Sequence, residues 1–116
     1  MGDALKKDAS FIEMVEKAIT ENLDDPDFRV EALAIYLKIN RTLLYRKVKS
    51  NTGKTPSLFM REFRLKQCLS FLLNQENTIK EVAFSVGFKD AAHFTNYFKA
   101  FYGISPSEWK ENNAKK

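Results

Sequence analysis

The sequence repeats itself, and this internal repeat limits the possible folds more than any other feature. A shift of 50 residues pairs residues of the same character: Leu44 with Phe94, Val48 with Phe98, Lys49 with Lys99, Gly53 with Gly103, Pro56 with Pro106 and Ser57 with Ser107. Before the turn the best shift is 49, which pairs Leu33 with Val82, Ala34 with Ala83 and Ile39 with Phe88. The second copy therefore has an extra turn residue. A solenoid usually needs three or more repeats, so we expect a duplicated module.

Each copy has the pattern of a short helix, a tight turn, a second helix and then a glycine before a proline-started helix. Apolar residues recur at helical spacing, and capping residues such as Asn40, Thr78 and Asp90 precede helices. Strand-like alternation is missing from the sequence, which predicts an all-α fold. We expect helices at about 10–22, 30–37, 41–51, 56–74, 79–86 and 91–102, with a final short helix after Ser105.

The predicted helix at about 56–74 is apolar around too much of its surface for one contact face, which predicts a linker between two subunits of structure. We expect one domain at 10–110, made of a first unit at about 10–55, this linker helix and a second unit at about 78–110. Ser10 and Glu13 have the spacing of a capping box. Residues 1–9 are therefore expected to form a flexible extension, and 111–116 a flexible tail.

Length and composition are those of an ordinary globular domain. The chain has 116 residues, 44% of them hydrophobic and 29% charged, which fits one domain. No apolar run approaches the roughly 20 residues of a membrane span, and residues 1–9 lack the apolar stretch of a signal peptide. Cys68 has no second cysteine for a disulfide within the chain. These features predict a cytoplasmic protein.

The positive charge is concentrated in the middle of the chain. Residues 1–37 have four basic and nine acidic side chains, a net charge of −5. Residues 38–66 have nine basic side chains against Glu62 alone, a net charge of +8, and residues 67–116 have a net charge of +1. A basic segment of this kind indicates a polyanion such as nucleic acid as the partner.

A short helix, a turn of three or four residues and a second helix are typical of the DNA-binding helix-turn-helix, whose second helix enters the major groove. The predicted linker helix spans roughly 27 Å at about 1.5 Å per residue. This is close to the roughly 34 Å between successive major-groove segments on one side of B-DNA. Because the copies follow each other in tandem, we expect one chain to read two non-palindromic segments about ten base pairs apart.

These residues resemble the DNA-binding domain of AraC/XylS-type bacterial transcription regulators over about residues 10–110. The first unit matches at Leu33-Ala34, Leu44-Tyr45-Arg46 and Thr52-Gly53-Lys54-Thr55-Pro56; the second matches at Ala83, Gly87-Phe88, Asp90, Phe94, Phe98-Lys99, Gly103, Ser105-Pro106 and Trp109. The resemblance implies seven helices and binding of double-stranded promoter DNA. Family members usually join this domain to a sensing or dimerising domain.

The resemblance therefore implies the output domain of a larger sensor or two-component regulator. RNA polymerase is a further candidate partner. We expect the isolated domain to be a monomer, with dimerisation through other domains of the full-length protein, and we expect no cofactor, no membrane contact and no small-molecule ligand in this domain.

The outward faces of the two predicted second helices supply the candidate base-reading residues. Leu44, Val48, Phe94 and Phe98 are expected to point inward, which leaves Arg41, Thr42, Tyr45 and Arg46 outward in the first unit and Ala91, Ala92, Thr95 and Asn96 in the second. Arg46 can grip a guanine with two hydrogen bonds, although a phosphate contact or a surface ion pair is the alternative. Many relatives have larger polar or basic residues on the second face, so we expect this unit to discriminate more weakly.

Basic and hydroxyl side chains around these helices are the candidate phosphate contacts. They are Lys38, Lys47, Lys49, Lys54, Thr55, Lys89, Lys99 and Ser105. The amino ends of the proline-started helices offer further N–H groups.

Other residues favour structural roles. His93 is the only histidine, so we expect no metal site but a phosphate contact or partial packing. Cys68 is expected to be a small buried residue and Trp109 to pack the last helix down. The sequence offers no nucleophile and base pair, no glycine-rich phosphate loop and no metal ligand set, so we expect no catalytic residues. The alternative to DNA binding is a helical protein-interaction module, which does not require the basic segment.

Overall fold

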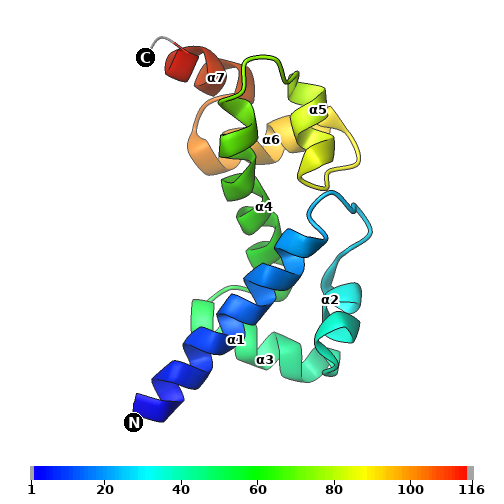
Figure 1. The fold of residues 1–116 in the computed structure, drawn as a ribbon, viewed down its shortest axis with the longest axis vertical. Coiled ribbons are helices and arrows are strands. Elements are labelled where there is room, and N and C mark those ends of the chain that lie inside the picture. Colours follow the sequence, from blue (N-terminus) through cyan, green and yellow to red (C-terminus); the bar gives the residue numbers. More distant parts are fainter. Residues whose placement is uncertain (1, 115–116) are drawn as a thin grey trace. The chain divides into compact units, whose positions relative to one another are not determined.

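The computed structural model describes the backbone of residues 2–114 and the side chains from Ser10 onward. This part of the chain forms seven α-helices and no strand, which confirms the predicted all-α fold. They are α1 (Gly2–Glu21), α2 (Val30–Leu37), α3 (Arg41–Thr52), α4 (Pro56–Leu72), α5 (Ile79–Ser85), α6 (Ala91–Tyr102) and α7 (Pro106–Ala114) (Figure 1). None of the described helices is both long and apolar enough to cross a bilayer.

The predicted start of the first helix was wrong. α1 begins at Gly2, so Ser10 lies inside the helix and residues 2–9, expected as an extension, continue its backbone. This stretch contains alanine, leucine and lysine, which have high helix propensity, and no proline interrupts it. α7 likewise runs to Ala114, into the expected tail, whose last two residues lie outside the described part. α4 ends at Leu72, slightly before the predicted end.

The chain divides into two compact units, and the boundary falls within α4. Unit 1 comprises residues 1–22 and 27–61, and unit 2 comprises residues 23–26 and 62–116. Unit 2 is therefore not a continuous stretch of sequence: the segment Leu23–Pro26, between α1 and α2, belongs with the helices that follow α4.

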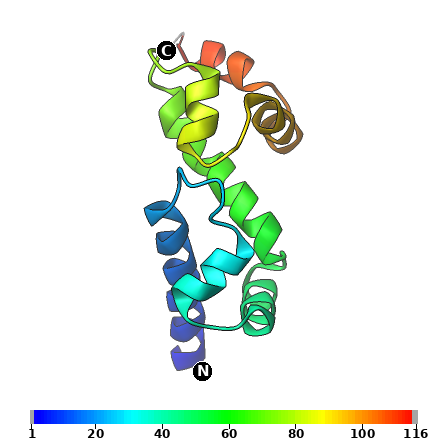
Figure 2. The same ribbon diagram turned by 90° about the vertical axis from the view of Figure 1, so that its right-hand side faces the viewer.

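In unit 1, α1, α2 and α3 pack against one another (Figure 2). The core of unit 1 is formed by buried apolar residues: Phe11, Val15, Ala18, Ile19, Phe28, Leu33, Ala34, Leu44, Val48 and Met60. Met14, which the helical pattern of α1 predicts on the same inward face, is exposed instead. Because Leu44 and Val48 are fully buried, the opposite side of α3 faces solvent.

In unit 2, α5, α6 and α7 lie around the second half of α4 (Figure 1). The buried cluster contains Leu65, Cys68, Leu72, Val82, Ala83, Val86, Phe94 and Phe98, and several partly buried aromatic residues pack against it. Trp109 packs against this cluster, as expected from the sequence. The Cys68 side chain is also buried as predicted, and its Sγ donates to the Leu65 carbonyl at 2.9 Å.

Both units use the same backbone bonds in the turn between their paired helices. In unit 1, the N–H groups of Lys38 and Ile39 donate to the carbonyls of Ile35 and Ala34. In unit 2, Gly87 and Phe88 donate to Phe84 and Ala83 in the same way. This is the Schellman pattern, which needs a left-handed residue after the helix. Lys38 has φ 60° and Gly87 has φ 87°.

The helices after these turns also begin and end alike. The side chains of Asn40 and Asp90 accept from the N–H groups of Leu43 and His93, each at 2.7 Å. At the other ends, the N–H groups of Gly53 and Gly103 donate to Lys49 and Lys99, each at 2.8 Å. The repeat seen in the sequence is thus a repeat of hydrogen bonds that hold α3 and α6.

Candidate nucleic-acid interface

The outer face of α3 presents the four residues predicted to read bases in unit 1. Arg41, Thr42, Tyr45 and Arg46 are all exposed, and Tyr45 exposes 48% of its surface. They occupy this face because the opposite face packs into the core of unit 1 and because the Asn40 cap fixes where α3 begins. α3 therefore offers two guanidinium groups, a phenol and a hydroxyl to a partner.

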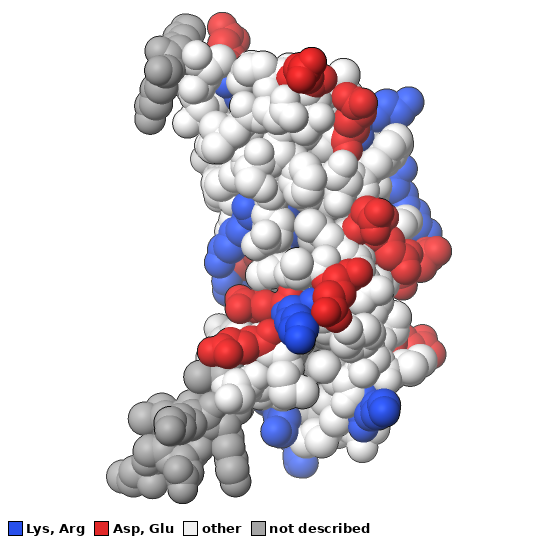
Figure 3. All heavy atoms as spheres, viewed as in Figure 1, with Lys and Arg blue, Asp and Glu red and all other residues white. Residues whose placement is uncertain are grey.

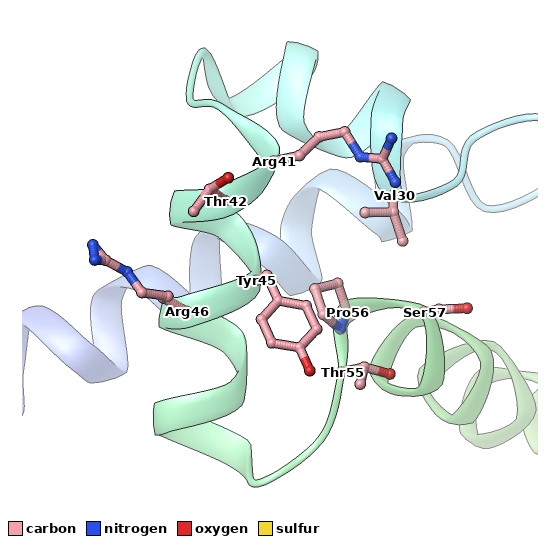
Figure 4. A pocket seen from close by; sticks show the side chains of 8 residues that line it. All are labelled: Val30, Arg41, Thr42, Tyr45, Arg46, Thr55, Pro56 and Ser57. Atoms are coloured by element: carbon pink, nitrogen blue, oxygen red, sulfur yellow. The ribbon is translucent and has the colours of Figure 1, made fainter.

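These four side chains line a hollow of about 560 Å³ with residues of neighbouring elements. The others are Val30 at the start of α2 and Thr55, Pro56 and Ser57 at the start of α4. In Figure 4, the Tyr45 ring lies beside Pro56 with its hydroxyl toward Thr55, and Arg41 extends toward Val30. Val30, Pro56 and Ser57 were not predicted as site residues, because their approach to α3 depends on tertiary packing.

Basic side chains continue along α3 past this hollow. Arg46, Lys47 and Lys49 line a second hollow of about 480 Å³ together with Leu43, Tyr45 and Ser50. Lys47 Nζ lies 4.9 Å from the centre of the Phe11 ring, a cation–π arrangement that directs it toward α1. Of the lysines predicted as phosphate contacts on α3, Lys49 is thus the one nearer the face of Arg46, three residues earlier in the helix.

The matching face of α6 is small and uncharged. Ala92 and Asn96 are exposed, while Ala91 and Thr95 are half-buried. The Asp90 carboxylate caps α6, and its second oxygen lies 3.0 Å from His93 Nδ1. A metal-binding group of three His, Cys, Asp or Glu side chains is not found in the part of the chain that is described.

The other residues predicted as phosphate contacts are divided between exposed and half-buried positions. Lys38, Lys89 and Lys99 are exposed, whereas Lys54, Thr55 and Ser105 are half-buried. The Thr55 hydroxyl accepts from the Leu58 N–H at 3.2 Å, and the Ser105 hydroxyl accepts from the Glu108 N–H at 3.1 Å. Both hydroxyl groups therefore cap helices.

One basic residue of the segment 38–66, whose net charge is +8, is buried instead of lying on the surface. Arg64 is 6% exposed, and its guanidinium donates to the backbone carbonyls of Leu23, Asp25 and Val86. The charge count by itself had placed this residue in the polyanion-binding surface. Its burial depends on carbonyls far away in the sequence, for which the charge pattern has no signal.

The acidic residues near the N-terminus are also separate from the basic face of α3. Figure 3 shows acidic side chains gathered over α1 and the segment that follows it. In this region Tyr36 Oη donates to the Glu21 carboxylate, and this hydrogen bond raises the pKa of the tyrosine.

The thiol of Cys68 is not available for chemistry at these surfaces. Burial raises its pKa to about 12, so it is protonated at neutral pH. The nearby Tyr102 phenol has its pKa raised to about 12 as well, mainly by burial and also by Cys68. Its hydroxyl donates to the Leu65 carbonyl at 3.1 Å, which gives it a structural role.

Comparison with known proteins connects this arrangement to a family. The model of the helix-turn-helix domain family matches residues 33–112. The transcriptional activator RhaS of Mannheimia succiniciproducens is 34% identical over 88 residues, which are 76% of this chain and 33% of that protein. The chain spans 8% and 29% of the length of two other curated relatives.

Solved structures show the same fold. The C-terminal domain of the two-component response regulator yesN from Fusobacterium nucleatum has a TM-score of 0.78 and 27% identity, covering 87% of this chain and 98% of that one. The DNA-binding domain of AdpA, solved in complex with a target DNA, has a TM-score of 0.77 and 26% identity, covering 84% of this chain and 87% of that one. Several of these relatives and structural neighbours are named as transcription regulators. On this evidence the chain belongs to the AraC/XylS-type family of helix-turn-helix transcription regulators.

Proposed function

We propose that the chain binds promoter DNA sequence-specifically, with α3 and α6 entering two major-groove segments about ten base pairs apart. The observation that carries this proposal is the outer face of α3, where Arg41, Tyr45 and Arg46 surround an open hollow on a helix whose other side is buried. The AdpA domain with the same fold was solved with DNA.

The residues divide into two roles in this proposal. Arg41, Thr42, Tyr45 and Arg46 read bases from α3, and Ala91, Ala92, Thr95 and Asn96 read a second segment from α6. Arginine can pair with a guanine edge and asparagine with an adenine edge, while alanine can contact a thymine methyl group. Around them, Lys38, Lys47, Lys49, Lys54, Thr55, Lys89, Lys99 and Ser105 contact phosphates.

We propose that the whole chain acts in the cytoplasm as the DNA-binding output domain of a longer regulator. It spans no more than about a third of the length of the relatives compared above, and one solved neighbour is the C-terminal domain of a two-component response regulator. The isolated domain is a monomer in this proposal, and RNA polymerase is the partner once DNA is bound. Sedimentation of the domain at micromolar concentration tests its monomeric state, because dimers there would contradict it.

The test begins with selection of bound sequences from a random duplex pool, followed by competition binding with the selected duplex and with random duplex. Arg46→Ala should weaken binding to the selected duplex by about 10- to 100-fold while changing binding to random duplex much less. Lys49→Ala should weaken both to a similar degree and reduce the steepness of the salt dependence. Lys17→Ala, on the acidic α1, is the matched control and should change neither.

Three results would count against the proposal. Selection that yields no preferred sequence would contradict sequence-specific binding. Equal losses on both duplexes for Arg46→Ala would make Arg46 a phosphate contact. Binding to random duplex that does not fall steeply with salt would favour the helical protein-interaction module instead.

A further inference from the structure

Arg64 is a buried cation on α4, in the part of the helix that belongs to unit 2. Its Nη1 donates to the Leu23 carbonyl and to the Val86 carbonyl, the latter at 3.0 Å, and its Nη2 lies 3.4 Å from the Asp25 carbonyl. Burying a guanidinium is costly unless its donors are satisfied, and well-packed apolar residues often stabilise a core as well or better. The identity of this residue therefore calls for a reason beyond filling space.

That reason lies in the turn between α5 and α6. Val86 is the C-cap residue of α5, so the carbonyl that Arg64 binds is one of those left without a helical partner at the end of this helix. Gly87 follows with φ 87° and starts the path of the chain toward α6. The guanidinium therefore lies directly against the residues that set where α6 begins.

Gly87 packs so closely against Arg64 that there is no room for a side chain at position 87. A Cβ atom at Gly87 would lie 1.7 Å from Arg64 Nη1 and 2.5 Å from the Leu23 carbonyl oxygen. By contrast, a Cβ atom at Gly53 or Gly103 would meet nothing within 4 Å. The left-handed conformation favours glycine at position 87, although Lys38 adopts it in unit 1, and the lack of space beside Arg64 and the Leu23 carbonyl excludes a larger residue. The turn therefore has little room to move while the guanidinium is in place.

We infer that Arg64 is a positioning residue for DNA recognition: it fixes the α5–α6 turn and thereby the reading face of α6, without touching DNA itself. This inference rests on the proposed function. In unit 1 the equivalent turn position is occupied by Lys38, whose side chain is exposed to solvent. The turn of unit 1 therefore has no counterpart of the glycine that packs against a guanidinium. The neutral face of α6 has few strong donors, so it depends on accurate placement to discriminate between base pairs.

The experiment compares Arg64→Gln and Arg64→Lys with the wild-type chain on three duplexes: the selected site, the same site with the α6 segment scrambled, and the same site with the α3 segment scrambled. Scrambling the α6 segment should weaken wild-type binding by about tenfold, a size typical of one lost base-pair preference. In Arg64→Gln the same scrambling should have no effect, while scrambling the α3 segment should weaken binding as strongly as in the wild type. Arg64→Lys keeps the charge but loses the planar set of donors, so its discrimination should be intermediate.

Lys66→Gln is the matched control, because Lys66 lies on the same helix and is exposed. It should reduce binding to all three duplexes alike and keep the discrimination at the α6 segment. Circular dichroism and urea unfolding establish that each variant is folded at the temperature of the binding assay.

Several outcomes would overturn the inference. A folded Arg64→Gln that still discriminates at the α6 segment would make Arg64 purely structural, and equal losses on all duplexes would mean that Arg64 supports DNA binding as a whole rather than the reading face of α6. If both Arg64 variants are unfolded, Arg64 serves global stability and the inference is wrong. Failure of the wild-type chain to select any sequence would contradict the proposed function itself, which separates the two cases.

Discussion

The two helix-turn-helix units share their backbone bonds and differ in the side chains built on them. Asn40 and Asp90 cap their helices alike, and Lys38 and Gly87 occupy the same left-handed turn position. The fully buried side of α3 is formed by the aliphatic Leu44 and Val48, whereas that of α6 is formed by two phenylalanines, Phe94 and Phe98.

The outward faces differ even more. α3 presents two arginines and a tyrosine, while the same positions of α6 hold small or neutral residues. The duplicated part is the part that holds a helix in place, and the part that meets a partner is free to diverge. A repeat in sequence therefore predicts the scaffold of both units but not an equal share in recognition.

The largest expected effect on stability concerns Gly87 and Gly103, two left-handed glycines of unit 2 whose surroundings differ. Gly87→Ala should lower the free energy of unfolding by about 3 kcal/mol or more, because left-handed strain adds to collisions with Arg64 and the Leu23 carbonyl. Gly103→Ala introduces the left-handed strain without any collision, so it should lower the free energy of unfolding by about 1 to 2 kcal/mol. Urea unfolding of both variants measures the difference. Equal losses would mean that the packing around Gly87 relaxes without cost.

The reading faces can be compared at one pair of equivalent positions. Arg46→Ala should reduce affinity for the selected duplex by about 10- to 100-fold, and Asn96→Ala by less than about tenfold, because in the proposed function the guanidinium makes two charge-assisted bonds to a guanine edge. Competition binding at a fixed salt concentration gives both values. A larger loss for Asn96→Ala would reverse the order of the two units in recognition.

The helices before the turns differ in their N-terminal caps. Thr78 and Glu81 form a complete capping box at α5, whereas Arg29 gives α2 no side-chain cap. Thr78→Ala should destabilise the chain by about 1 kcal/mol at neutral pH. Ser50→Ala, on an exposed part of α3, is the control and should change stability by less than about 0.5 kcal/mol.

The capping box also makes part of this stability depend on pH. Hydrogen bonds from the Thr78 backbone and side chain lower the pKa of Glu81 in the folded chain. A carboxyl with a lowered folded pKa stabilises the fold above its ordinary pKa, and this contribution is lost as the pH falls through the lowered value. The difference between wild type and Glu81→Gln should therefore shrink in acid, because only the wild type has the titrating carboxylate, and urea unfolding at neutral and acidic pH can measure this. A difference that stays constant would exclude the carboxylate as its source.

The smallest expected effect is at Lys38. Lys38→Gly relieves left-handed strain at φ 60° but adds freedom to the unfolded chain, so a net gain of about 0.5 to 1 kcal/mol is expected. Lys38→Ala keeps the strain and should give no gain. Thermal unfolding of the two variants checks this, and equal midpoints would show that the strain at this position is negligible.

Local chemistry explains which features could be predicted from the sequence. Asn40, Thr78 and Asp90 each bond to an N–H three residues along the chain, so their roles as caps were predicted and are confirmed. The capping box expected at Ser10 was wrong, because strong helix formers before it let α1 begin at Gly2. A cap signal indicates a helix start only where the preceding residues disfavour helix.

Features that depend on distant parts of the chain could not be predicted in this way. From the sequence, Arg64 is predicted to be one more cation on the surface. In the structure it is bound by the carbonyls of Leu23 and Val86, which are more than 20 residues away in the sequence. Val30 and Ser57 join the hollow on α3 only because α2 and α4 begin beside it. The outward face of α3 follows from the helical period, but the shape of the hollow does not.

The discontinuity of unit 2 has a consequence for building chimeric regulators. A cut within α4 looks natural for exchanging the second copy between relatives, since it separates the two halves of the repeat. Yet the fragment after such a cut lacks Leu23–Pro26 and leaves the guanidinium of Arg64 without two of its acceptors. A graft of the second half should therefore include the segment between α1 and α2 from the same donor. The transferred piece then matches the unit that folds together, which is larger than the part of the sequence that is repeated.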